Sequence, residues 1–84
     1  MNLSEKAHAV KTQKDFVDFL HALASDLRQN KDSWGNPELD QFLEAFAAWV
    51  TDMNGYYINM DIPQPENLNW SAIADMFMGA RVYE

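Results

Sequence analysis

Residues 37–55 read PELDQFLEAFAAWVTDMNG, and this stretch decides the fold class. Its apolar residues recur every three or four positions, as they do along one face of an α-helix. The positions that make this apolar stripe are Leu39, Phe42, Leu43, Phe46, Val50 and Met53. The spacing predicts a helix over 37–54 that buries the stripe in the core.

The residues at the two ends of this stretch favour a helix with these limits. Asn36 is a good N-cap, and Pro37 suits the first helical position because proline has no N–H to leave unpaired there. Asn54-Gly55 offers the left-handed conformation with which helices commonly end. We therefore expect a long loop over 55–68.

The flanking segments predict two more helices. An apolar spacing of three and four predicts a helix over 13–30, with Thr12 and Asp15 resembling a capping box at its start. A similar spacing follows Asn69, a favourable N-cap, and predicts a helix over 69–82. The loop between the second and third helices contains two prolines, and its alternating apolar residues predict a short extended piece at 58–62.

The composition indicates one small all-α domain. The chain has 84 residues, 48% of them apolar and 13% aromatic, which suits one packed core and leaves no room for a second domain. We expect a compact three-helix domain over 1–84, in which residues 1–11 either are flexible or add one helical turn. No apolar run reaches the length of a membrane span or of a secretory signal, so we expect a cytoplasmic protein, monomeric or weakly dimeric.

Charge is distributed unevenly along the chain. The net charge is −7, yet residues 1–31 carry +1, while residues 32–80 carry eight acidic residues and no Lys, Arg or His. One interpretation is a solvated surface that aids solubility, and the other is a surface complementary to a basic protein. Direct nucleic-acid binding is disfavoured because it needs clustered Lys and Arg.

Few residues in the sequence suggest catalysis or a cofactor. The chain has no cysteine and two histidines, and His21 with Asp18 three residues earlier fits a polar helix face better than a metal site. Asp40 and Glu44 are four residues apart, as paired catalytic carboxylates can be, but ordinary acidic helix faces share that spacing. We expect no enzyme, no metal and no cofactor.

The aromatic residues have two interpretations. They either fill the small core and anchor the loops, or form an exposed patch rimmed by acidic residues that binds a protein. The candidate partner-binding residues that follow from charge and aromatic content are Trp34, Asn36, Asp40, Glu44, Trp49, Asp52, Tyr56, Tyr57, Asp61 and Trp70. Trp34 is either a plug for the core or an exposed anchor for a partner.

Several landmarks from residue 15 to the end of the chain resemble a family of small bacterial helical domains of unknown function. They are Phe16-Val17-Asp18-Phe19-Leu20, Trp34-Gly35-Asn36, Phe42-Leu43-Glu44-Ala45-Phe46-Ala47-Ala48-Trp49, Trp70 with Ala74, and Tyr83-Glu84. The tryptophan loop of that family usually reads Trp-Glu-Asn, so Gly35 departs from its pattern. The resemblance implies no activity, because the family has none assigned.

These observations favour a non-enzymatic acidic module that binds a basic protein through residues 32–80. In size and charge the chain is similar to immunity proteins that neutralise toxins, which gives the hypothesis its most concrete form. One alternative is a small-ligand or enzymatic site in a pocket between the second and third predicted helices. Another is a homodimer whose role is purely structural.

Overall fold

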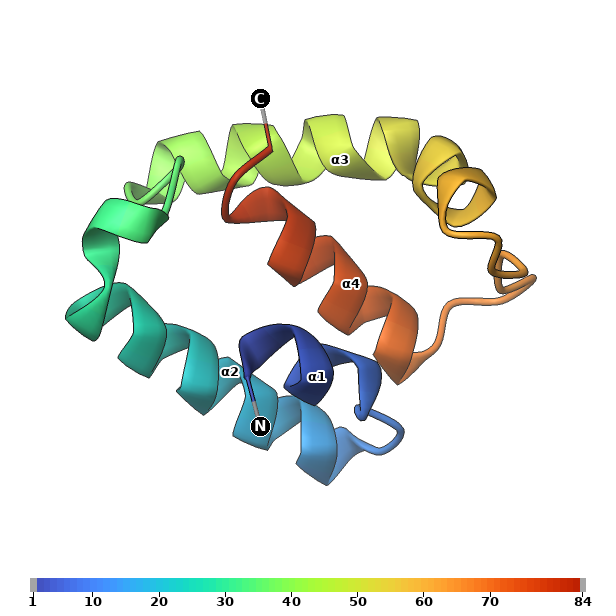
Figure 1. Cartoon of the computed structure of the whole chain (residues 1–84), viewed down its shortest axis with the longest axis horizontal. Helices are drawn as coiled ribbons and strands as arrows, with labels where there is room; N and C mark the ends of the chain where they lie inside the picture. Colours follow the sequence, from blue (N-terminus) through green and yellow to red (C-terminus); the bar gives the residue numbers. More distant parts are fainter. Residues whose placement is uncertain (1, 84) are drawn as a thin grey trace.

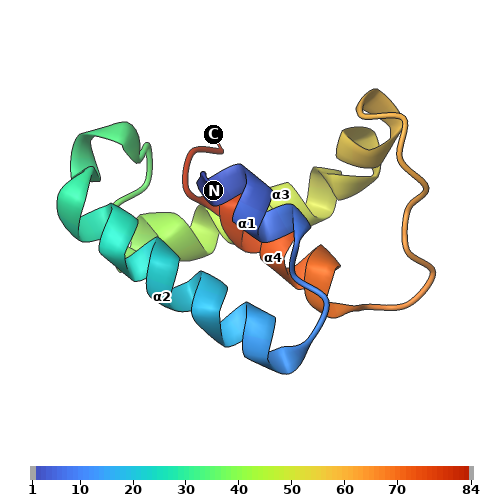
Figure 2. The ribbon, with the colours of Figure 1, turned by 60° about the horizontal axis from the view of Figure 1, so that its bottom comes forward.

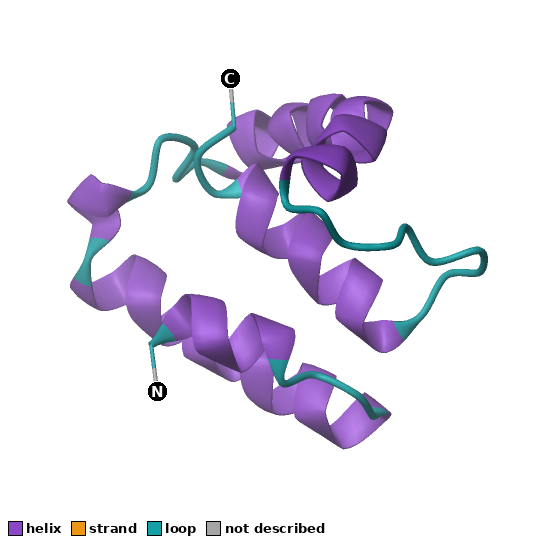
Figure 3. Cartoon of the chain, turned by 45° about the vertical axis from the view of Figure 1, so that its right-hand side comes forward, coloured by secondary structure: helices purple, strands orange, loops and turns teal. Residues whose placement is uncertain are grey.

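The computed structural model describes residues 2–83, and it is all-α as the sequence predicts. Its helices are α1 (Leu3–His8), α2 (Gln13–Gln29), the short 3₁₀ turn η1 (Lys31–Ser33), α3 (Leu39–Asn59) and α4 (Trp70–Ala80) (Figure 1). No strand occurs within residues 2–83, and the predicted extended piece at 58–62 is wrong because α3 continues to Asn59 and a turn follows at residues 60–61. Figure 3 shows the loop over 60–69 extending to one side of the helices.

Helix α4 lies between the other helices (Figures 1 and 2). Its backbone contacts those of α1, α2 and α3, whereas the backbones of α2 and α3 do not approach each other in the part of the chain that the structure describes. Its buried residues are mostly small, which lets neighbouring helices come close: Ala72, Ala74, Met76 and Ala80. The fold therefore depends on α4 to join α2 to α3.

The Phe77 ring makes this connection in the core. Its centroid lies 5.6 Å from that of Phe16 on α2, and 5.9 Å and 5.1 Å from those of Phe42 and Phe46 on α3. All three pairs have the edge-to-face geometry that aromatic rings prefer. One ring on α4 thus packs against both helices, whose backbones do not approach each other within residues 2–83.

Trp34, in the connection between α2 and α3, is a core residue that is 8% exposed. Its indole Nε1 donates a hydrogen bond of 2.7 Å to Asp26 on α2. Asp26 also lies 3.6 Å from Arg81, whose guanidinium sits 5.8 Å from the Trp34 ring centroid. Trp34 is therefore a plug for the core rather than an exposed anchor. Together, Trp34, Asp26 and Arg81 join the end of α2 to the end of α4.

Asn36 does not cap α3, contrary to the sequence prediction. Its side-chain amide donates to the carbonyls of Ala80 and Tyr83 at 3.1 Å and 2.8 Å, and its backbone N–H donates to Arg81 O at 2.9 Å. The side chain that should cap α3 instead donates to carbonyls at and just beyond the C-terminal end of α4, where no helical N–H is available to them. Helix α3 accordingly begins at Leu39, after Glu38 as N-cap, rather than at residue 37.

Asn54-Gly55 does not end α3. The predicted helix end at residue 54 and loop start at residue 55 are therefore wrong. The helix continues to Asn59, and Asp61 takes the left-handed conformation, with φ of 55°. Ile62 N–H donates to Tyr57 O and Asp61 N–H to Ile58 O, the two hydrogen bonds of a Schellman stop. Burial of Tyr57, which is 4% exposed, outweighs the cost of about 1 kcal/mol for a mid-helix glycine.

The buried face of α3 is also rotated from the predicted stripe. Leu39 and Leu43 are 73% and 57% exposed, whereas Ala45, Trp49 and Tyr57 are the buried residues of the helix. The reason is that α4 covers the side of α3 that carries Ala45 and Trp49. Since α2 does not approach α3, no helix within residues 2–83 covers the two leucines.

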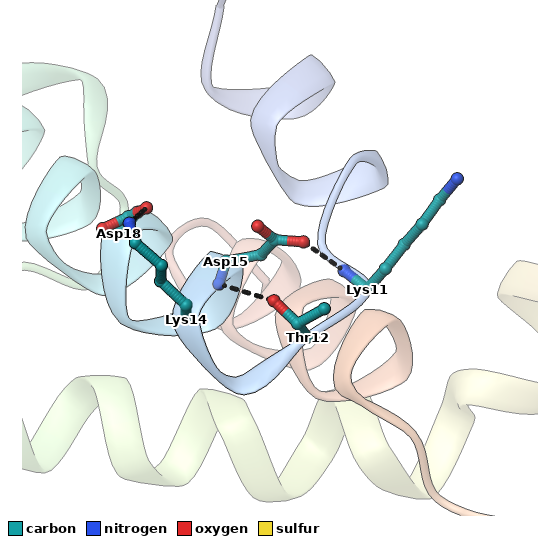
Figure 4. A network of polar contacts seen from close by, with 5 residues as sticks. All are labelled: Lys11, Thr12, Lys14, Asp15 and Asp18. Atoms are coloured by element: carbon teal, nitrogen blue, oxygen red, sulfur yellow. Dashed lines mark hydrogen bonds and ion pairs between the residues drawn. The ribbon is translucent and has the colours of Figure 1, made fainter.

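The remaining helix starts follow local sequence signals. Thr12 Oγ1 accepts from Asp15 N–H at 3.1 Å as predicted, and the Asp15 carboxylate accepts from Lys11 N–H, one residue before the expected partner (Figure 4). Asn69 caps α4 as predicted, because its side chain accepts from Ala72 N–H at 2.7 Å. Helices α2 and α4 end at residues 29 and 80, close to the predicted 30 and 82. Residues 3–8 form the short helix α1, which packs on α2 and α4.

The two helical glycines predict opposite effects of substitution by alanine. A Cβ at residue 55 meets nothing within 4 Å, so Gly55→Ala should raise the free energy of unfolding by about 0.5–1 kcal/mol. A Cβ at residue 79 would overlap the Trp49 indole, so Gly79→Ala should lower it by about 1–3 kcal/mol. Urea unfolding of the two variants checks this pair, and an unchanged midpoint for Gly79→Ala would contradict the packing of α3 on α4.

Candidate functional site

The acidic residues of the cation-free segment are mostly exposed. We call the following seven exposed carboxylates the acidic surface: Asp32, Glu38, Asp40, Glu44, Asp52, Asp61 and Glu66. Glu38 lies 3.6 Å from Lys31, and the other six make no ion pair with any residue in the range 2–83. The excess negative charge predicted from the sequence is therefore presented to solvent rather than neutralised within the fold.

The first half of α3 combines this charge with apolar side chains. Asp40 and Glu44 are one helical turn apart, and so are the exposed Leu39 and Leu43 beside them. Two adjacent columns, one acidic and one apolar, therefore run along the same part of the helix. Surfaces with both features bind partners through apolar contact at the centre and charge at the rim.

An apolar cleft of about 280 Å³ adjoins Leu39 between α2 and α3. Its walls come from both helices and from the loop that joins them, and Phe77 of α4 also lines it. The lining side chains that matter most here are Leu20, Leu27, Trp34, Leu39, Phe42 and Phe77. The cleft lies between α2 and α3, whose backbones diverge from their connection (Figure 1).

A second cavity, of about 190 Å³, lies where α1, α3 and α4 meet. Ser4 and His8 of α1 line it, together with Trp49 and Tyr56 of α3 and Asp75 of α4. Tyr57 Oη donates a hydrogen bond of 3.2 Å to Asp75 Oδ2. The ring centroids of Trp49 and Tyr56 are 5.3 Å apart, so this cavity places a carboxylate beside an aromatic wall.

The surroundings of this cavity shift the protonation of its side chains. Burial raises the pKa of the Asp75 carboxyl above its usual value, and the hydrogen bond from Tyr57 and the charge of His8 oppose that rise. Burial and the nearby Asp75 charge raise the pKa of Tyr57 to about 12, and they raise that of Tyr56 as well. The cavity therefore disfavours negative charge on its own side chains.

The structure separates the ten candidate residues of the sequence analysis into three groups. Trp34, Trp49 and Tyr57 are buried, so they form no exposed aromatic patch, and Asn36 is used within the fold. Exposed acidic candidates are Asp40, Glu44, Asp52 and Asp61, of which Asp52 accepts a hydrogen bond from the Tyr83 hydroxyl. Of the remaining two aromatic candidates, Tyr56 lines the Asp75 cavity. Trp70 is 38% exposed, and its ring centroid lies 5.6 Å from that of Phe16 in a tilted arrangement.

Neither Asp75 nor His8 is among the ten candidate residues expected from the sequence. Asp75 is the one charged residue of α4, which otherwise contains only apolar and small residues, and that isolation was an available signal. On the polar face of α2, the Asp18 carboxylate accepts a hydrogen bond of 3.0 Å from Lys14 Nζ. No group of three metal-ligating side chains comes together in the described part of the chain.

Comparison with protein families fits the landmarks seen in the sequence. The sequence model of a family of unknown function, DUF7660, matches residues 12–84. The chain belongs to this family. The matched residues include Trp34 and Asn36, whose contacts hold the ends of α2 and α4 together, while α1 lies before the matched region.

No curated protein and no solved structure matches the chain. None of the helices in the range 2–83 combines the length and the apolar character that crossing a bilayer requires.

The half-buried carboxylates of Asp26 and Asp75 should make the stability of the fold depend on pH in opposite directions. The hydrogen bond from Trp34 holds the pKa of Asp26 below its usual value of 3.8, so Asp26 stabilises the fold above that pH and loses the effect as pH falls. Asp75 has a raised pKa, so its ionisation costs stability as pH rises above 3.8. At pH 7, Asp26→Asn should lower the free energy of unfolding by about 1–2 kcal/mol, and Asp75→Asn should raise it. Both differences should shrink toward pH 3, and unfolding curves at the two pH values measure them.

Ionisation of the Tyr57 phenol should lower the stability of the fold at alkaline pH. Its pKa rises from 10.0 to about 12 on folding, so the protonated phenol stabilises the fold below pH 10, and this contribution falls as pH rises from 10 to 12. The loss is on the order of 2 kcal/mol. Tyr57→Phe removes this titration, so its stability should decline less over that range, and parallel curves for the two proteins would contradict the prediction.

Proposed function

We propose that this protein is a non-enzymatic module that binds a basic protein through the first half of α3 and the acidic surface. The observation that carries the proposal is the exposed pair Leu39 and Leu43 beside the exposed pair Asp40 and Glu44. An exposed apolar pair costs the isolated fold solubility, and a partner would cover it. The acidic column selects a partner with Lys or Arg next to its apolar residues.

The cleft between α2 and α3 suggests how such a partner docks. Its apolar walls and volume of about 280 Å³ suit one large apolar side chain, with Leu39 at its edge. A basic amphipathic helix or loop would place that side chain in the cleft and its cations over Asp40 and Glu44. In its most concrete form, the proposal is a cytoplasmic bacterial immunity-type protein that neutralises a basic toxin.

Affinity capture from the source lysate, after nuclease treatment, tests this function. The wild-type protein and Glu5→Gln/Asp18→Asn should recover the same basic protein at low salt, and less of it at roughly physiological salt. The variant Asp40→Asn/Glu44→Gln removes as many charges from the acidic column. It should slow association with that protein by about 3- to 10-fold.

A second variant tests the apolar column separately. Leu43→Ser changes an exposed side chain, so the fold should keep its stability while the complex dissociates faster. Equal kinetics for the wild type and both α3 variants would overturn the proposal. Loss of binding in the control Glu5→Gln/Asp18→Asn would do the same, because it would place the interface elsewhere.

A ligand-binding function is a second candidate, and the Asp75 cavity favours it. A half-buried carboxylate in a cavity with aromatic walls is typical of small-molecule sites. It agrees with the alternative of a pocket between the helices now labelled α3 and α4.

Structural self-association is a third candidate, favoured by exposed apolar residues near the loop over 60–69. They are Ile58, Met60, Ile62 and Leu68. Sedimentation at two protein concentrations distinguishes it, because a monomer at both concentrations excludes a role that requires the dimer.

A further inference from the structure

We infer that the cavity between α1, α3 and α4 binds a primary alkylammonium group, with Asp75 as its anion and Trp49 and Tyr56 as its aromatic wall. This inference rests on the second candidate function, ligand binding, and names the ligand class. The observations behind it are separate from those at the acidic surface and at the cleft between α2 and α3, because none of the side chains of those two sites lines this cavity.

The charge of the cavity selects a cation. Asp75 is the carboxylate among the lining residues, and no Lys or Arg lines the cavity. Within residues 2–83, Asp75 has no ion pair, and it receives one hydrogen bond, from Tyr57. A carboxylate can accept about four hydrogen bonds, so the remaining acceptor positions are available to the N–H donors of a ligand.

The aromatic residues strengthen the preference for an ammonium ion. Trp49 and Tyr56 line the same cavity as Asp75, and the Tyr56 and Tyr57 rings form an edge-to-face pair with centroids 5.1 Å apart. A cation within about 6 Å of a Trp or Tyr ring face is attracted by its negative potential. A carboxylate and aromatic rings on one cavity are a combination that recognises organic ammonium groups.

The size and remaining lining of the cavity favour a primary amine on a short chain. A volume of about 190 Å³ equals that of about six liquid waters, which suits a short alkyl chain better than a large ring system. Ala7 and Met78 supply apolar surface for that chain, and Ser4 supplies a hydroxyl acceptor for the ammonium. A primary ammonium has three N–H donors, which Asp75 and Ser4 can share.

The energetics of Asp75 agree with this assignment. Without a cation, burial penalises the ionised carboxylate, as its raised pKa indicates. A bound ammonium would offset that penalty, so the ligand should stabilise the fold and lower the pKa of Asp75. His8 on α1 and Tyr56 and Tyr57 on α3 are the titratable groups that face Asp75, and all three must be followed in the same measurement.

Two-dimensional ¹H–¹⁵N NMR of the full chain, titrated with n-butylammonium chloride against potassium chloride at equal ionic strength, tests the inference. Saturable shifts should appear at His8, at the Trp49 indole N–H and at 75–79, and potassium should produce none. Asp75→Asn should weaken binding at least tenfold while the variant stays folded. Asp40→Asn, which removes an acid of the acidic surface, should bind as the wild type does.

Neutral and peptide probes separate the ways in which the inference can fail. If n-butanol binds as well as n-butylammonium, the ammonium assignment is overturned while a ligand cavity remains. If neither binds, both the inference and the ligand-binding function are overturned. Equal shifts in Asp75→Asn and the wild type would place the cation elsewhere and overturn it too.

A further comparison identifies the source of the ammonium group. N-acetyl-lysine N-methylamide carries the same butylammonium chain on a peptide backbone. Tighter binding than n-butylammonium would assign the cavity to a lysine side chain of a partner protein, and weaker binding would assign it to a free amine. Either result supports the inference, whereas failure of both to bind overturns it.

Discussion

The hydrogen bond from Trp34 Nε1 to Asp26 is the constraint on which the rest of the structure depends. Helices α2 and α3 make no backbone contact with each other in the described chain, so their relative position must be fixed through α4 and through their connection. The bond fixes the connection to α2, and Arg81, close to both Asp26 and the Trp34 ring, fixes it to α4. Both Trp34 and Asn36 thus serve the fold, which gives a structural reason for the Trp34-Gly35-Asn36 landmark seen in the sequence.

The existence of the three long helices could be predicted because it depends on local signals. Thr12 and Asn69 cap the helices they precede. Each side-chain oxygen accepts a hydrogen bond from the backbone N–H three residues later. The end of α3 could not be predicted in this way, because it depends on the burial of Tyr57 against α4. A left-handed Asp61 then provides the stop that the Asn54-Gly55 pair was expected to give.

The candidate site likewise has a part that the sequence predicts and a part that depends on how the helices pack. Net charge by segment is readable from the sequence, so the acidic surface could be anticipated. Exposure of Leu39 and Leu43 could not, because apolar spacing predicts which residues share a face but not whether another helix covers it. The Asp75 cavity needs three helices, including α1, whose role in lining a cavity no sequence pattern indicated.

The two proposed sites, the first half of α3 with its cleft and the Asp75 cavity, both contain residues in environments that are unfavourable for the isolated fold. Helix α4 contributes a side chain to each of them. Exposed leucines and a half-buried carboxylate each cost the isolated chain free energy, and such departures are expected where a ligand later compensates them. Phe77 lines the cleft between α2 and α3, while Asp75, two residues earlier, lines the cavity on another side of α4. A ligand in either site that shifts α4 therefore changes the other site, and thermodynamic linkage makes any such coupling equal in both directions.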